Sequence, residues 1–298
     1  MDIQPIFDFS ADVNVGRMPD WIRQAFGSQD YAHTSKIVAQ HALTTVCEEA
    51  RCPNRGECWS RGTATFMLLG AACTRACGFC AVKTGRPDPL DQKEPQRVAA
   101  AAKAMGIDYI VLTSVNRDDQ NDGGVSIFAE TLLALRAERH DMKLEVLTPD
   151  FHRCQPSAIE TIAKTMAAAD GDNVLVWGHN VETVPRLYKR VRKGSGYGRS
   201  LELLEKAHQV EHFETKSAIM LGLGEKQQEV LAVLQDLREA GVSRVALGQY
   251  LRPSRYHLAV EEYIPPEQFT DYEKFAKQLG FTWVKAGPLV RSSYHAED

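Results

Sequence analysis

Short apolar segments alternate with amphipathic stretches over most of the chain. Runs such as YIVLT (109–113) and NVLVW (173–177) are continuously apolar, as in strands buried on both faces, whereas the stretches between them repeat at helical spacing. The pattern predicts strands at 63–69, 109–113, 143–147, 173–177, 215–221 and 242–247, with a further short strand at 282–285. It predicts helices at 92–105, 127–139, 157–168, 199–212, 227–240 and 266–279, and a helical stretch near 184–191.

This alternation predicts an α/β fold, in which a parallel sheet is covered by helices. Six β/α units are two fewer than in a complete TIM barrel, so we expect an open, partial (β/α)6 TIM-like barrel. Chemistry in such barrels lies at the C-terminal ends of the strands. Residues 1–60 carry little periodicity, and we therefore divide the chain into an N-terminal extension (1–60), a barrel (61–260) and a C-terminal extension (261–298).

Composition narrows the class of protein. The formal net charge of −4 over 298 residues gives no sign of affinity for nucleic acid or membranes. No apolar run is long enough to span a bilayer, and the first residues, MDIQPIFDFSADV, lack the pattern of a signal peptide. We therefore expect a cytoplasmic protein, with monomer as the default state. In such a protein, clustered cysteines indicate metal rather than disulfides.

Six of the seven cysteines form two triplets. The first is Cys47, Cys52 and Cys58 (C-x4-C-x5-C), and the second is Cys73, Cys77 and Cys80 (C-x3-C-x2-C). Iron–sulfur clusters are held by cysteine thiolates, and three thiolates leave one iron of a four-iron cluster open to another ligand. Structural zinc is one alternative, but zinc favours C-x2-C pairs and four protein ligands. An electron carrier is another, although a carrier needs no open iron.

The motifs around these cysteines are recognisable. CTRACGFC (73–80) resembles the signature loop of the radical S-adenosylmethionine (SAM) superfamily, and CEEARCPNRGECW (47–59) resembles the N-terminal motif of lipoyl synthases. Eight further segments resemble the same family in order: TATFMLLG, FCAVKTGRP, LTSVNRDDQNDGG, EVLTPDF, HNVETVPRLYKRVR, LGLGE, GQYLRPS and GPLVRSSYHA. The resemblance to lipoyl synthase runs from residue 47 to residue 296. The sequence departs slightly from the family pattern at Trp177-Gly178 and at Ala218, and neither departure involves the cysteines.

The resemblance implies sulfur insertion by radical chemistry. A 4Fe–4S cluster on Cys73, Cys77 and Cys80 would bind SAM and generate a 5′-deoxyadenosyl radical. A second, auxiliary 4Fe–4S cluster on Cys47, Cys52 and Cys58 would supply the sulfur inserted at C6 and C8 of an octanoyl group carried on a lysine. The family holds the fourth iron of this cluster with a serine of the RSSY motif, which motif alignment assigns to Ser293. Sequence spacing leaves its neighbour Ser292 open as the alternative ligand.

The resemblance also implies partners and SAM contacts. The partners are octanoylated lipoyl carrier domains, namely the E2 subunits of 2-oxoacid dehydrogenases and the H protein of glycine cleavage, and an electron donor such as ferredoxin or flavodoxin. The candidate SAM contacts are Asn121, Asp122, Gly123, Gly124, Glu145, Asn180 and Arg192. Each has a simpler explanation: an ordinary turn for 121–124, a buried strand residue for Glu145, a helix cap for Asn180 and a surface ion pair for Arg192.

Overall fold

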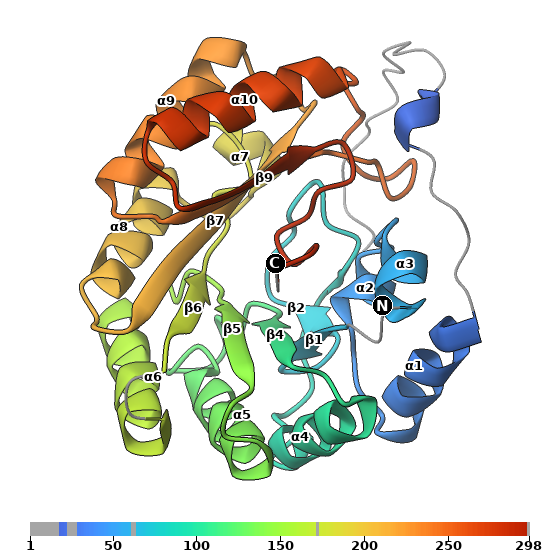
Figure 1. Cartoon of the computed structure of the whole chain (residues 1–298), viewed down its shortest axis with the longest axis vertical. Helices are drawn as coiled ribbons and strands as arrows, with labels where there is room; N and C mark the ends of the chain where they lie inside the picture. The colour runs from blue at the N-terminus through green and yellow to red at the C-terminus, as the bar shows by residue number, and fades with distance from the viewer. Residues whose placement is uncertain (1–17, 23–28, 61–63, 171–172, 297–298) are drawn as a thin grey trace.

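A parallel sheet of seven strands forms the frame of the protein. The computed structural model describes residues 18–22, 29–60, 64–170 and 173–296. In spatial order the strands are β1 (Thr65–Leu68), β4 (Tyr109–Ser114), β5 (Lys143–Leu147), β6 (Leu175–Gly178), β7 (Phe213–Leu221), β8 (Arg244–Gln249) and β9 (Trp283–Gly287). Every neighbouring pair is parallel, and the sheet curves into an open barrel with the helices outside it (Figure 1).

The outer helices follow the strands as the periodicity predicts. They are α4 (Glu94–Met105), α5 (Val125–Glu138), α6 (Gln155–Asp170), α8 (Tyr197–His208), α9 (Gln227–Glu239) and α10 (Pro266–Gln278). The stretch near 184–191 is instead two short pieces, the 3-10 helix η2 (Pro185–Leu187) and α7 (Tyr188–Val191). The first strand begins at Thr65, and residue 63, which the pattern included, lies outside the described residues.

The sheet continues beyond the six expected strands. The short strand expected at 282–285 is β9, which pairs with β8 from Arg244↔Trp283 to Gly248↔Gly287. The β-sheet therefore extends past residue 260, where the sequence pattern ended the barrel. Helix α10 packs beside β9, so part of the segment expected as an extension is built into the sheet and its outer layer.

Three helices lie in the N-terminal region, where the sequence shows little periodicity. They are α1 (Gln29–Gln40), α2 (Val46–Glu49) and α3 (Arg55–Ser60), preceded by the 3-10 helix η1 (Asp20–Ile22). Helices α1 and α3 pack together through the stacked rings of Tyr31 and Trp59, whose centroids are 5.2 Å apart. The Thr34 hydroxyl donates to the Trp59 carbonyl at 2.8 Å. These contacts place α2 and α3 beside β1, at the open side of the barrel (Figure 1).

Apolar packing makes the barrel wall a firm support for the site. Leu112 on β4, Val146 on β5 and Trp177 on β6 are fully buried, and the Trp177 ring stacks on Phe213 at 5.5 Å. Burial of each side chain of this size contributes roughly 1.5–3 kcal/mol. The loops at the C-terminal ends of the strands are therefore held on an ordered edge.

Candidate active site

The first cysteine triplet lines a cavity of about 470 Å³ together with the far end of the chain. Cys47 lies on α2, Cys58 on α3, and Cys52 in the turn between these helices. Ser293 lines the same cavity, whereas Ser292 does not. Three cysteines and one serine, from opposite ends of the sequence, thus line one space.

Hydrogen bonds hold the C-terminal segment against the first triplet. The Asn54 side chain donates to the Leu289 carbonyl at 2.7 Å. The Tyr294 hydroxyl contacts both carboxylate oxygens of Glu57 at 3.0 Å, and His295 Nε2 contacts the same carboxylate at 3.1 Å. Asn54 lies between Cys52 and Cys58 in the sequence, and Glu57 directly precedes Cys58. These bonds therefore fix the position of Ser293 relative to the cysteines.

Burial and a nearby cation set the electrostatics of this cavity. Burial raises the pKa of the Cys47 thiol to about 11 and also raises the pKa of Cys52. The buried Arg291 guanidinium acts in the opposite direction on Cys52. The Cys47 and Cys52 thiols are therefore protonated at neutral pH, and binding of iron would release their protons. Arg291 places positive charge where thiolates would form.

The second triplet lies in the loop after β1, at the C-terminal edge of the sheet. This loop contains an unexpected two-residue parallel pairing between β2 (Ala72–Cys73) and β3 (Lys83–Thr84). Burial raises the pKa of Cys77 to about 11 and that of Cys80 to about 12. The charge of Cys73 acts in the same direction on Cys77, and the charges of Cys73 and Cys77 act in the same direction on Cys80.

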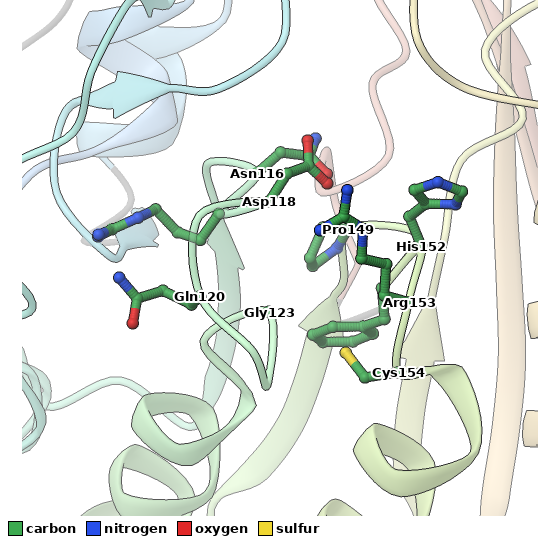
Figure 2. Close-up of a pocket in the computed structure, with 10 residues that line it drawn as sticks. Asn116, Asp118, Gln120, Gly123, Pro149, His152, Arg153 and Cys154 are labelled. Atoms are coloured by element: carbon green, nitrogen blue, oxygen red, sulfur yellow. The ribbon is translucent and has the colours of Figure 1, made fainter.

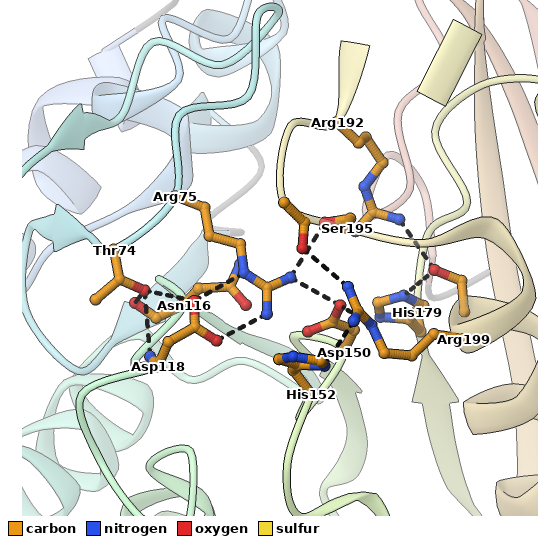
Figure 3. A network of polar contacts seen from close by, with 12 residues as sticks. Thr74, Arg75, Asn116, Asp118, Asp150, His152, His179, Arg192, Ser195 and Arg199 are labelled. Carbon is orange, nitrogen blue, oxygen red and sulfur yellow. Dashed lines mark hydrogen bonds and ion pairs between the residues drawn. The ribbon is translucent and has the colours of Figure 1, made fainter. Parts of the chain in front are cut away.

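An arginine inside the second triplet ties its loop to the barrel. Arg75 forms ion pairs with Asp118, after β4, and Asp150, after β5, each at 2.7 Å (Figure 3). It also donates to the Ser195 hydroxyl at 3.1 Å. These carboxylates raise the pKa of Arg75 despite its burial. Arg75 is not among the predicted site residues, although its place between Cys73 and Cys77 was a signal that could have found it.

His179 and Arg192 belong to a directed hydrogen-bond network after β6 (Figure 3). His179 Nδ1 must donate to the Thr148 carbonyl at 2.9 Å, which leaves Nε2 to accept from the Ser200 hydroxyl at 3.0 Å. Arg192 Nη1 donates to Ser200 Oγ at 3.3 Å and to the Asn180 carbonyl at 2.7 Å. Burial, reinforced by Arg192, lowers the pKa of His179 to about 4, so the ring is neutral.

Polar atoms without partners surround Glu182 next to this network. Glu182 has a left-handed backbone (φ 66°), which is strained for a residue with a side chain, and its carboxylate accepts from Asn180 Nδ2 at 3.1 Å. Among the described residues, Asn180 Oδ1, Thr183 Oγ1 and Arg192 Nε are buried and have no hydrogen-bond partner. Such atoms are rare in folded proteins and fit a site for a polar ligand. Asn180 and Arg192, both predicted SAM contacts, thus lie together.

The segment 121–124 has clear structural tasks. The Asp122 carboxylate accepts from the backbone N–H groups of Gly124 at 2.9 Å and Ser126 at 3.1 Å, which caps α5. Gly123 and Gly124 have φ of 62° and 85°, and a Cβ on Gly124 would lie 2.4 Å from the Leu69 side chain. Gly123 also lines a second cavity, of about 290 Å³, between the loops after β4 and β5 (Figure 2). Asn121 is exposed. Contact of this segment with SAM stays a prediction.

Glu145 is fully buried inside the barrel and already has partners. Lys216 Nζ lies 3.0 Å and 2.9 Å from its two carboxylate oxygens, and the Tyr109 hydroxyl donates to it at 2.6 Å. Both side chains of the Glu145–Lys216 ion pair are fully buried. Its predicted contact with SAM remains untested, and the charge of its carboxylate is balanced without a ligand.

Comparison with known proteins agrees with this geometry. Residues 67–237 match the family described as the Radical SAM superfamily, a range that contains the second triplet. The chain is 49% identical over 282 residues to the lipoyl synthase of Rubrobacter xylanophilus. The alignment covers 94% of this chain and 85% of the Rubrobacter protein. The chain belongs to the lipoyl synthase family. SAM and two 4Fe–4S clusters are the cofactors of this family, as the sequence predicts, and their assignment to the two cysteine triplets stays a prediction.

Solved structures support the fold alone. The Streptococcus suis enzyme SuiB bound to its precursor peptide SuiA aligns with a TM-score of 0.55 at 10% identity, over 93% of this chain and 58% of SuiB. SuiB bound to S-adenosylmethionine aligns with a TM-score of 0.56 at 13% identity, over 78% of this chain. The chain spans just over half the length of SuiB. Within the described residues, no helix is both long and apolar enough to cross a membrane.

Proposed function

We propose that this protein converts a protein-bound octanoyl-lysine into lipoyl-lysine by inserting sulfur at C6 and C8. Membership of the lipoyl synthase family supports this reaction. One structural observation carries it further: Cys47, Cys52, Cys58 and Ser293 line a single cavity although Ser293 lies at the opposite end of the chain. This geometry supports a cluster with three thiolate ligands and one serine ligand.

The two cysteine triplets would hold different clusters. When bound, SAM and the cluster on Cys73, Cys77 and Cys80 supply the radical that removes hydrogen, and the auxiliary cluster supplies sulfur. Ser293 is a harder ligand than a thiolate, which suits a cluster that must be taken apart. Ser292 does not line the cavity, which favours Ser293 as the ligand.

The residues after β6 would orient SAM. Asn180 Oδ1 and Arg192 Nε are unpaired and buried, so they can receive polar groups of a ligand without breaking existing bonds. The Glu182 carboxyl adds an acceptor whose charge acts on Cys77 and Cys80 and on both Arg192 and Arg291. Glu182 therefore lies within electrostatic reach of Cys77 and Cys80 in the second triplet and of Arg291, which lines the cavity of the first. The other predicted SAM contacts would contribute to SAM binding through the shape of the pocket rather than through an unpaired charge. They are Asn121, Asp122, Gly123, Gly124 and Glu145.

The partners follow from the proposed reaction. The substrates would be octanoylated carrier domains, either E2 subunits of 2-oxoacid dehydrogenases or the H protein of glycine cleavage. A ferredoxin or flavodoxin would supply electrons in the cytoplasm, and the protein would act as a monomer. Nucleic acid and membranes would take no part.

An anaerobic assay with an octanoyl-lysine peptide tests the proposal. The protein, loaded with iron and sulfide and supplied with SAM and a reductant, should yield 5′-deoxyadenosine and a peptide carrying two added sulfur atoms by mass spectrometry. A brown, iron-loaded protein that leaves both SAM and the peptide intact would favour an electron carrier instead.

A further inference from the structure

The long connection between β8 and α10 carries an exposed basic and aromatic loop. We call residues 252–257 the rim loop. Its Tyr256 side chain is 52% exposed, one of only five large apolar side chains exposed among the described residues. Arg255 is exposed beside it, with its guanidinium 5.0 Å from the centre of the Tyr256 ring. Arginine and tyrosine are the residue types most often central to protein–protein interfaces.

The arginines of the rim loop have neutral partners only. Arg252 donates to the carbonyls of His257 at 2.9 Å and Arg255 at 2.6 Å, and Arg255 donates to the Tyr256 hydroxyl at 2.8 Å. Arg51, from the first cysteine motif, donates to the Pro253 carbonyl at 3.4 Å. Within the described residues no carboxylate forms an ion pair with these three guanidinium groups. Three positive charges are therefore left for an external partner.

The rim loop connects the two cysteine segments. His257 Nε2 donates to the Cys80 carbonyl at 3.1 Å, and the Leu258 N–H donates to the Gly78 carbonyl at 2.9 Å. Arg51 lies between Cys47 and Cys52 in the sequence, so its bond to Pro253 reaches the first triplet. A partner seated on this loop would stand next to both proposed clusters.

The loop is held in place before any partner arrives. The Tyr250 hydroxyl donates to the carbonyl of Leu258, a fully buried residue, at 2.8 Å. The Ser254 hydroxyl donates to His257 Nδ1 at 2.9 Å. An ordered loop loses little conformational entropy on binding, which favours a docking role over that of an ordinary solvated loop.

We propose that the rim loop and Arg51 form the docking surface for an acidic face of the octanoylated carrier domain. This inference rests on the proposed function, because it assigns the partner of the same site. The arginines would attract acidic side chains beside the modified lysine, and Tyr256 would pack against the domain. The octanoyl chain itself would then enter the barrel between the two cysteine segments.

The test compares binding of a whole carrier domain with binding of a short octanoyl-lysine peptide that lacks the domain's surface. The variants are Arg255→Glu and Tyr256→Ala. Lys274→Glu, on the exposed face of α10 where Lys274 Nζ lies 3.4 Å from Asp271, is the control for equal change of charge. Dissociation constants are measured by calorimetry on the iron-loaded protein without turnover, so the result does not depend on activity.

The expected result separates the two ligands. Arg255→Glu should weaken binding of the octanoylated domain by about tenfold or more at low salt, and the loss should shrink as salt is added. Peptide binding should change less than about twofold, and Lys274→Glu should change neither. Equal losses for the domain and the peptide, or no loss for the domain, would overturn the docking surface. Domain binding that responds as expected, without any lipoyl product from the parent protein, would instead overturn the proposed function.

Discussion

At the scale of single residues, the two triplets differ in what completes them. Cys47, Cys52 and Cys58 share their cavity with Ser293, whereas Cys77 and Cys80 lie in electrostatic contact with Glu182, beside unpaired polar atoms suited to a ligand. In the proposed function, Ser293 completes the first set from within the protein. The second is next to a site that can receive a cofactor, and substitutions in the two sets should therefore fail differently.

Replacing one cysteine from each triplet separates the two roles. Cys77→Ala should abolish 5′-deoxyadenosine formation, because the cluster that binds SAM would lose a ligand. Cys52→Ala should retain SAM cleavage but form no lipoyl product, because only the sulfur source would be lost. Both products are measured in one reaction by liquid chromatography and mass spectrometry. Lipoyl product from Cys52→Ala would refute the role of the first triplet.

The two adjacent serines offer a matched pair of substitutions. Ser293→Ala should reduce lipoyl product by about tenfold or more while 5′-deoxyadenosine still forms, because the cavity loses its oxygen ligand. Ser292→Ala should be close to neutral, since Ser292 does not line the cavity shared by the three cysteines. Iron content per chain provides a second measurement. A larger loss of product for Ser292→Ala would reverse the assignment of the ligand.

Sequence spacing could not choose between these serines, because neighbours differ only in the direction of their side chains. The structure distinguishes them through the cavity that Ser293 lines. The cysteines, in contrast, were predicted as cluster ligands from spacing alone. Arg75 was missed because ion pairs with Asp118 and Asp150 join loops that are distant in sequence. A charged residue inside a metal motif deserves the same scrutiny as the ligands.

At the scale of elements, the C-terminal segment acts with α3. Glu57 on α3 binds both Tyr294 and His295, which follow Ser293 directly. The strands and long helices of the barrel were predictable because their periodicity repeats several times. Helices α2 and α3, with four and six residues, are too short for a period to show. The place of β9 in the sheet was also hidden, since pairing with β8 is a long-range contact.

Removing the Glu57 carboxylate should loosen the serine ligand. Glu57→Leu should lower lipoyl product and iron content while SAM cleavage continues, because Tyr294 and His295 would lose their shared acceptor. Glu57→Gln should keep part of the product, since an amide oxygen still accepts a hydrogen bond from Tyr294. The readouts are iron per chain and the Mössbauer spectrum of the auxiliary cluster.

A matched control is available on the neighbouring helix. Glu49 lies in the same cysteine motif on α2 and is not a partner of Tyr294 or His295 in the described part of the chain. Glu49→Leu should leave the iron content and the Mössbauer spectrum unchanged. If it disturbed both as much as Glu57→Leu, the effect would be a general one on the N-terminal helices.

At the scale of the whole molecule, buried polar groups make stability depend on pH. His179 is neutral in the folded protein, with a pKa lowered to about 4, but in the unfolded chain it takes up a proton below about pH 6.5. Between these values the unfolded state binds more protons, so the free energy of unfolding falls as pH falls. The full effect is about 3 kcal/mol, and it levels off below about pH 4.

Urea unfolding followed by circular dichroism between pH 7 and about pH 5 measures this dependence. His179→Gln should weaken the dependence on pH, whatever its effect on stability at neutral pH. The control is His140→Gln, because His140 lies on a loop at the opposite end of the strands from His179. This variant should show the same dependence of the free energy of unfolding on pH as the parent protein. An unchanged slope in His179→Gln would show that other groups control acid stability.

The central claim is that the cavity shared by Cys47, Cys52, Cys58 and Ser293 holds the source of the inserted sulfur. The most direct measurement is to reconstitute the clusters with a heavy sulfur isotope and run one turnover with an octanoyl-lysine peptide in unlabelled buffer. The mass of the product is then measured by mass spectrometry. Heavy sulfur is expected at both C6 and C8 in the product of the parent protein, and no lipoyl product is expected from Cys52→Ala. Light sulfur in the product, or labelled product from Cys52→Ala, would contradict it.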